Sequence, residues 1–229
     1  MTTAEWQAIR MSLQVAVVSV IVCLPIAIAC AWLLARKQFY GKLAFETLIN
    51  LPLVLPPVVT GYLLLSMFGR RSFLGGFLES MFGIRIVFDW KGAALASAIV
   101  AFPLMVRAIR VSFEAIDQRL EHAAKTLGAG PLDSFLTISL PLAKRGILAG
   151  SLLGFARSLG EFGATIMIAG NIPGRTQTIP LYMYNLLETP GGMAKASRLV
   201  WFSVAIAATA LAFGEWIDRR ERRTLKGQR

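Results

Sequence analysis

The most regular feature of this sequence is a series of long apolar runs separated by short polar segments. A helix crosses the hydrocarbon core of a bilayer with about 20 predominantly apolar residues, and five runs reach or approach this length. We expect membrane-spanning helices at about residues 13–35, 43–68, 92–113, 146–168 and 199–217. The pattern therefore predicts an all-α integral membrane protein, folded as a single transmembrane domain over residues 1–229.

Prolines divide the second run, where Pro52, Pro56 and Pro57 occur close together. Each proline removes a backbone N–H donor and disturbs the turn before it. Inside a membrane, the carbonyl groups freed in this way need protein or water partners. Two interpretations stay open: a broken helix that faces other helices or a cavity, or a tolerated kink without a role.

Small residues mark one face of the fourth run. Gly146, Gly150 and Gly154 recur at every fourth position, so one stripe of the predicted helix carries no side chain. A second helix can approach the backbone closely along such a stripe. We expect these three glycines to be helix-packing positions.

The same run carries two charged residues, Arg157 and Glu161. An unpaired charge inside a membrane is costly, so the two side chains are expected to pair with one another or to face water. Ionisable residues at membrane depth usually have a function. The alternatives are a place on a pathway through the membrane and a purely structural ion pair.

The composition agrees with lipid as the main solvent, because 55% of the 229 residues are hydrophobic and 16% are charged. A net charge of +11 would also suit nucleic acid, but the basic residues gather at the ends of the apolar runs and in the C-terminal tail. Of 24 Lys and Arg residues, fifteen are counted on one side of the predicted spans, including Arg107 and Arg110 at the end of the third span, and eight on the other, while Arg157 lies within the fourth span. The positive-inside rule then predicts an N-terminus outside, a cytoplasmic C-terminus and no nucleic-acid partner.

The chain offers little for catalysis or metal binding. Cys23 and Cys30 lie seven positions apart in one apolar run, a spacing that matches no redox or zinc motif, and the only histidine is His122 in a predicted cytoplasmic loop. An intramembrane enzyme, the alternative from another class, would need convergent nucleophiles, bases or ligands at membrane depth. We expect no catalysis by this chain alone, no metal site and no bound cofactor.

The predicted cytoplasmic loop over residues 117–141 begins with the features of a short helix. Asp117 can cap its N-terminus, and Gly128 can end it. Four small or apolar residues share one face between them: Leu120, Ala123, Ala124 and Leu127. A helix of this kind needs a groove in another protein, the membrane surface or its own bundle to cover that face.

The spacing in this loop resembles the EAA loop of ABC importer permeases, whose short helix docks on the ATPase subunit. The leading Glu of that pattern would fall at His122, whereas this chain has Glu121 one position earlier. The resemblance implies a role in ATPase coupling for the residues of the loop that fit or flank the pattern. They are Glu121, His122, Ala123, Ala124, Gly128, Ile138, Leu140 and Pro141.

Four segments outside this loop are similar to the molybdate permease family: residues 51–57, 156–164, 171–174 and 189–192. The resemblance implies the fold of a type I ABC importer permease, with about five transmembrane helices and a cytoplasmic coupling helix. Sulfate and tungstate permeases share much of it, notably the Gly-Glu-Phe-Gly core at 160–163. Transport of tungstate, sulfate or thiosulfate is therefore the alternative to molybdate.

The resemblance also implies partners and a pathway. It would make this chain the translocation pathway for molybdate in a bacterial cytoplasmic (inner) membrane, working as a homodimer with ABC ATPase subunits and a periplasmic or extracellular oxyanion-binding protein. The chain has no GxxxxGK[ST] phosphate loop, so the partner ATPase would use the ATP. The candidates for the translocation path are Arg157, Ser158, Glu161, Pro52, Pro56 and Pro57.

Overall fold

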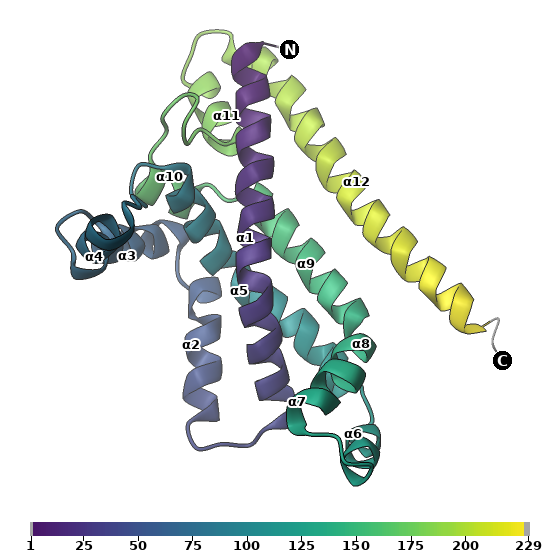
Figure 1. Cartoon of the computed structure of the whole chain (residues 1–229). Helices are drawn as coiled ribbons and strands as arrows, with labels where there is room; N and C mark the ends of the chain where they lie inside the picture. The colour runs from purple at the N-terminus through teal and green to yellow at the C-terminus, as the bar shows by residue number, and fades with distance from the viewer. Residues whose placement is uncertain (1, 227–229) are drawn as a thin grey trace.

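The computed structural model describes the backbone of residues 2–226, and the side chains of these residues except 195, 210, 211 and 213–226. The described residues form helices joined by turns and loops, with no strand among them (Figure 1). The all-α class predicted from the apolar pattern is therefore confirmed. The helices are α1 (Thr3–Arg36), α2 (Lys42–Val54), α3 (Pro57–Phe68), α4 (Phe73–Phe82), α5 (Trp90–Glu114), α6 (Gln118–Thr126), α7 (Pro131–Ser134), the π-helix η1 (Phe135–Ser139), α8 (Leu140–Leu142), α9 (Lys144–Leu159), α10 (Gly163–Ala169), α11 (Ile179–Leu187) and α12 (Gly192–Lys226).

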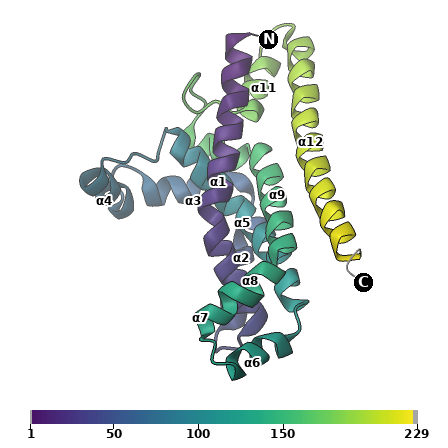
Figure 2. The ribbon, with the colours of Figure 1, turned by 45° about the vertical axis from the view of Figure 1, so that its right-hand side comes forward.

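Three helices, α1, α5 and α9, make up the core of the molecule, and α1 and α9 lie side by side in both ribbon views (Figures 1 and 2). Helix α5 is the central one, because 67% of the residues in its most apolar stretch are buried, compared with 28% in α1. Short side chains on α5 allow α1 and α9 to pack closely against it. Helix α5 contributes a row of buried alanines: Ala93, Ala94, Ala96, Ala98 and Ala101.

The glycine stripe of α9 faces α5. Gly146, Gly150 and Gly154 are all buried. A Cβ atom at Gly150 would lie 2.8 Å from Cγ1 of Ile109, and one at Gly154 would lie 2.6 Å from the sulfur of Met105. Helix α5 thus occupies the space that the missing side chains leave open, which is the kind of packing that the spacing indicates.

The second predicted span, 43–68, is divided into α2 and α3. Their axes differ by 112° across the break at Leu55 and Pro56, far more than a proline kink in a continuous helix. Pro57 is the first residue of α3, where its fixed φ and missing N–H are tolerated. Helices α3 and α4 consequently project from the core to one side (Figure 1).

The fourth predicted span, 146–168, also differs from the single helix that we expected. Helix α9 ends at Leu159, and α10 begins only at Gly163. Glycine is a poor helix former, and two glycines flank this break. Arg157 therefore lies on α9, whereas Glu161 lies in the break, so the expectation that both residues share one helix is wrong.

Length and composition make two described helices, α1 and α5, able to cross a membrane, and up to four spans result if the bent pairs α2 with α3 and α7 to α8 with α9 each count as one. Helix α5 covers the third predicted span, and α1 extends beyond the first. The fifth, 199–217, falls within α12, but part of it lies outside the described side chains. So do Lys195 and the basic residues of the tail, Arg219, Arg220, Arg222, Arg223, Lys226 and Arg229. Five spans therefore remain a prediction.

Candidate functional site

The candidate coupling helix α6 begins and ends at the residues that the sequence indicates. The Asp117 side chain accepts a hydrogen bond of 2.9 Å from the backbone N–H of Arg119. Gly128 has a φ of +94°, in the left-handed region. The N–H of Ala129 then donates to the carbonyl of Ala124 at 3.0 Å, the six-to-one bond of a Schellman motif. Local chemistry alone therefore defines both ends of this helix.

No residue of α6 is buried. On its small and apolar face, Leu120 is 48% exposed and Ala123 is also exposed, while Ala124 is partly covered. Leu127, the C-cap residue on the same face, is 89% exposed, and His122 is exposed. The helix lies at the end of the molecule opposite the N-terminus (Figure 1). The described residues of the chain leave this face uncovered.

Glu121 differs from its neighbours because its carboxylate turns towards the core. Its Oε1 atom lies 2.9 Å from Nε of Arg36, the last residue of α1, and accepts a hydrogen bond of 2.8 Å from the hydroxyl of Ser139 in η1. Arg36 also donates from Nη2 to the carbonyl of Ile116 at 3.1 Å. The sequence pattern indicates Arg36 only as one of the basic residues at the end of an apolar run, and it indicates no role for Ser139.

The second half of the EAA-like pattern packs on the core. Ile138 lies in η1 and is half-buried; Leu140 and Pro141 begin α8, where Leu140 is half-buried and Pro141 exposed. The ring of Phe135 packs edge-on against Trp32 of α1, with centroids 5.5 Å apart. The loop therefore has an exposed half, α6, and an anchored half, η1 with α8.

Arg157 and Glu161 form an ion pair, with Nη2 and Oε2 2.8 Å apart. The second carboxylate oxygen of Glu161 accepts a hydrogen bond of 2.8 Å from the N–H of Ala164, in the first turn of α10. A carboxylate is favoured there by the partial positive charge of the helix N-terminus. The Glu161 side chain is 2% exposed and that of Arg157 is 29% exposed, so the guanidinium is the accessible member of the pair.

The other pathway candidates are only partly brought together with this pair. A Cβ atom at Gly163 would lie 3.0 Å from Cβ of Pro57, so the start of α3 touches the break after α9. Pro56 is the N-cap residue of α3, and Pro52 lies inside α2, on the other side of the bend. Ser158 is buried, and its hydroxyl has no hydrogen-bond partner among the described residues.

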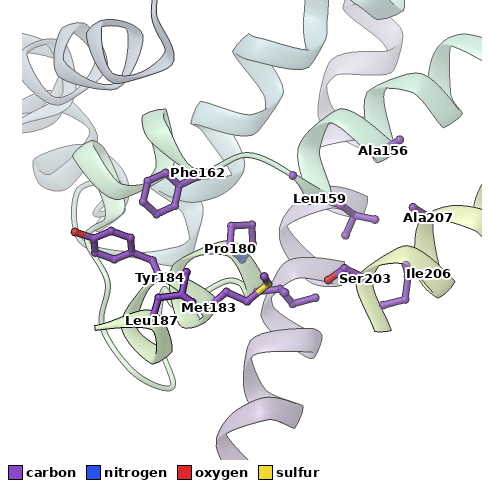
Figure 3. A pocket seen from close by; sticks show the side chains of 12 residues that line it. Ala156, Leu159, Phe162, Pro180, Met183, Tyr184, Leu187, Ser203, Ile206 and Ala207 are labelled. Atoms are coloured by element: carbon purple, nitrogen blue, oxygen red, sulfur yellow. The ribbon is translucent and has the colours of Figure 1, made fainter. Parts of the chain in front are cut away.

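A cavity of about 510 Å³ opens between the end of α9, α11 and α12 (Figure 3). Phe162 and Tyr184 lie at one end of it, with ring centroids 5.4 Å apart, and Ile206 of α12 lies at the other. Its lining is almost entirely apolar, with Ser203 as an exception. A doubly charged anion would lose its hydration there without compensation. The lining of this cavity is therefore unfavourable for an unhydrated anion.

A charged cluster lines a second cavity, of about 420 Å³, beside α4. Glu79 accepts hydrogen bonds from Arg70 at 3.3 Å and from Arg85 at 2.8 Å, and Asp89 lies 3.7 Å from Arg175. The hydrogen bond from Arg70 is the main cause that lowers the pKa of Glu79 below its ordinary value, and Arg85 acts in the same direction. In the sequence these arginines indicate only the orientation of the chain in the membrane.

Metal ligands do not gather anywhere in the part of the chain that the structure describes, where no three or more His, Cys, Asp or Glu side chains form a cluster. Cys23 and Cys30 are free thiols on α1, and the thiol of Cys23 donates to the carbonyl of Ala98 at 3.5 Å. The expectation that this chain holds no metal and no cofactor stays a prediction.

Comparison with known proteins gives one family and a consistent group of relatives. Residues 12–223 match the family described as "Binding-protein-dependent transport system inner membrane component". The chain is 55% identical to the molybdenum transport system permease protein ModB of Haemophilus influenzae, over 96% of both chains, and 53% identical to its Escherichia coli namesake, over 97% of both. It is 41% identical to the sulfate transport system permease protein CysW of Synechococcus elongatus, over 77% of this chain and 62% of that one.

Two solved structures share the fold. A chain of a bacterial alginate ABC transporter, in complex with an alginate pentasaccharide-bound periplasmic protein, superposes with a TM-score of 0.76 at 17% identity, over 96% of this chain and 80% of that one. A chain of the MetNI methionine ABC transporter, in an inward-facing conformation, gives a TM-score of 0.66 at 15% identity, over 95% and 94%. At such identities the likeness shows the fold alone.

Proposed function

Because this chain belongs to the family of binding-protein-dependent transport system inner membrane components, we propose that it is the permease subunit of an ATP-driven molybdate importer. The observation that carries this proposal is its identity of 55% and 53%, over nearly the whole length, with two ModB permeases. In this role the chain forms the pathway for the anion, and a separate ATPase subunit hydrolyses ATP.

The exposed face of α6 supports the ATPase as the cytoplasmic partner. Leu120 and Leu127 are exposed on this helix, and fully burying a leucine side chain against another surface is worth about 1.5–3 kcal/mol. A groove on the ATPase receives this face, in the manner of an amphipathic helix bound in a cleft. ATP binding and hydrolysis then move α6, and with it the membrane helices.

A second copy of the chain and an oxyanion-binding protein on the outside complete the proposed transporter. The projecting helices α3 and α4 expose several large apolar side chains, among them Tyr62, Phe73 and Phe77, and a second copy or lipid would cover them. The predicted orientation, with the N-terminus outside and α6 in the cytoplasm, agrees with their places at opposite ends of the molecule (Figure 1).

Arg157 is the residue that we assign to the anion pathway. Guanidinium has five N–H donors, and the ion pair with Glu161 engages only part of them. The remaining donors suit an oxyanion, while the buried carboxylate weakens the positive charge, so the anion is attracted without being trapped. Pro57 and Ser158 lie near the same break in the bundle, because Pro57 contacts Gly163 and Ser158 is close to the end of α9. Glu161, Pro52 and Pro56 are the other pathway candidates.

Uptake by proteoliposomes tests the proposal. The chain is reconstituted with its ATPase subunit, with ATP enclosed in the vesicles. The binding protein and labelled molybdate are added outside, and the label that enters the vesicles is measured. ATP-dependent uptake that excess unlabelled molybdate suppresses is the expected result. Uptake that needs no ATPase, or no uptake of any oxyanion, would show that the proposed function is wrong.

A related oxyanion is the second candidate, and the 41% identity to CysW, named as a sulfate permease, is the observation that favours it. Competition with tungstate, sulfate and thiosulfate in the same vesicles separates the alternatives. If sulfate or thiosulfate suppresses molybdate uptake as well as molybdate itself does, the substrate class stands but the choice of molybdate does not.

A further inference from the structure

Three side chains from distant parts of the chain meet where the candidate coupling helix leaves the core. Arg36 ends α1, Glu121 belongs to α6, and Ser139 ends the π-helix η1. One oxygen of the Glu121 carboxylate receives both the Arg36 guanidinium, at 2.9 Å, and the Ser139 hydroxyl, at 2.8 Å. The side chains of Arg36 and Glu121 are 5% and 13% exposed, so this contact is largely shielded from water.

Glu121 is thereby different from the rest of α6. The helix turns by about 100° per residue, which puts position 121 beside the face formed by Leu120, Ala123, Ala124 and Leu127. That face is open to solvent, while Glu121 is held by the core. The two faces of one short helix therefore meet different partners, and Glu121 is not available to the partner that covers the leucines.

Each partner of Glu121 leads to a different part of the membrane domain. Arg36 is continuous with α1 and also holds the carbonyl of Ile116, just after α5. Ser139 is followed directly by α8 and α9, and α9 runs to Arg157 and the break before α10. The ring of Phe135 fastens η1 to Trp32 of α1. A displacement of α6 must therefore act on α1 and α9 together.

We propose that Arg36, Glu121 and Ser139 form a joint that transmits movement of α6 to α1 and α9, with Glu121 a positioning residue for coupling instead of a contact to the ATPase. This inference rests on the proposed function, in which α6 docks on the ATPase. A charge-assisted pair with little exposure to water suits such a joint, because it is directional and weakly screened by salt. Loss of the joint uncouples ATP hydrolysis from molybdate transport, while the exposed face of α6 can still dock on the ATPase.

The test compares ATP consumption with transport in the complete reconstituted transporter. Glu121→Gln keeps the size of the side chain and one acceptor oxygen but removes the charge that holds Arg36. Retention of the ATPase during purification should be unchanged. The number of ATP molecules hydrolysed per molybdate imported should rise by about fivefold or more, because coupling between two sites ordinarily amounts to a factor of at least about five. The double variant Arg36→Glu with Glu121→Arg rebuilds the ion pair but not the bonds to Ile116 and Ser139, so it should lower this ratio only part of the way back.

Glu114→Gln is the matched control, because Glu114 also pairs with an arginine, Arg110 at 2.7 Å, but lies outside the joint. Its ratio of ATP to molybdate should equal that of the unmodified transporter. Ser139→Ala removes one of the two bonds to Glu121 and leaves the ion pair, so it should raise the ratio by a smaller factor. This milder variant carries the test if Glu121→Gln fails to assemble.

Two outcomes would overturn the joint. In the first, Glu121→Gln weakens ATPase retention and lowers uptake and hydrolysis in proportion, which would make Glu121 a docking contact. In the second, both Glu121→Gln and Ser139→Ala leave the ratio unchanged. If the unmodified chain retains no ATPase, the proposed function fails and this inference fails with it; a normal unmodified transporter keeps the two questions apart.

Discussion

At the scale of single residues, the Arg157 and Glu161 pair combines a structural and a functional interpretation that the sequence left as alternatives. Glu161 is buried and receives the N–H of Ala164, so it stabilises the start of α10. Arg157 remains partly exposed at the end of α9. Glu161 can therefore have a structural role, while Arg157 has a role in transport.

Replacing Arg157 with Gln should lower molybdate uptake by roughly tenfold or more, because a hydrogen bond to a charged group is worth about 1.5–3 kcal/mol. Assembly with the ATPase should persist, so uptake is measured per assembled complex. The single change leaves Glu161 buried without its partner, which is destabilising by itself. The double variant Arg157→Gln with Glu161→Gln removes this effect and should stay defective. Full transport by the double variant would withdraw Arg157 and Glu161 from the pathway.

Gly128 offers a residue-scale test of α6. At a φ of +94°, a side chain is strained by about 1–2 kcal/mol, and a β-branched one by more. Gly128→Val should therefore disturb the end of the helix, weaken ATPase retention and reduce uptake. Gly130→Val is the matched control, because Gly130 has a φ of −68° and a Cβ atom there would meet no atom within 4 Å. Equal behaviour of the two variants would remove the docking role from this turn.

At the scale of elements, the contact of α9 with α5 depends on the absence of side chains. A leucine at Gly150 would overlap Ile109 and force the helices apart, at a cost of about 1–3 kcal/mol. The melting temperature of the purified protein should fall by about 2–4 °C for each kcal/mol. The neighbouring Ala149 is exposed, so Ala149→Leu should leave the melting temperature nearly unchanged. A normal melting temperature for Gly150→Leu would mean that α9 packs elsewhere.

The sequence predicts those elements best whose limits depend on neighbouring residues. Asp117 and Gly128 define α6 through local hydrogen bonds, and the apolar run at 92–113 coincides closely with α5. The apolar pattern does not predict the break after Leu159, because apolar residues resume directly after it. Its causes are partly local, in the two flanking glycines and in the Glu161 carboxylate that accepts the N–H of Ala164. They are partly tertiary, because Gly163 lies against the start of α3.

Contacts between distant residues have no local signal at all. Arg36 and Glu121 are 85 positions apart, and nothing in either neighbourhood points to the other. The prolines at 52, 56 and 57 indicated an interruption, yet the 112° angle between α2 and α3 depends on how α3 packs against α10. The sequence thus indicates the candidate residues, but not the distant residues that they contact.

At the scale of the whole molecule, the distribution of basic residues predicts the orientation in the membrane. A reporter that is active only in the cytoplasm should work when it is fused after Arg229 and should fail at the N-terminus. Activity is compared after normalising to the amount of fusion protein. The reverse pattern would place α6 outside the cell, where no ATPase could reach it, and would contradict both the orientation and the docking of α6.

The π-helix η1 sets the rotational phase between the two ends of the loop. A π-helical turn holds one residue more than an α-helical turn of similar length, and each residue turns a helix by about 100°. Deleting one residue within Phe135–Ser139 would allow a regular α-helix there. It would also rotate the segment before η1, with α6, by about a quarter of a revolution relative to the glycine stripe of α9. The exposed face of α6 and the glycine stripe of α9 would both keep their residues. However, α6 could no longer face the ATPase while α9 packs against α5.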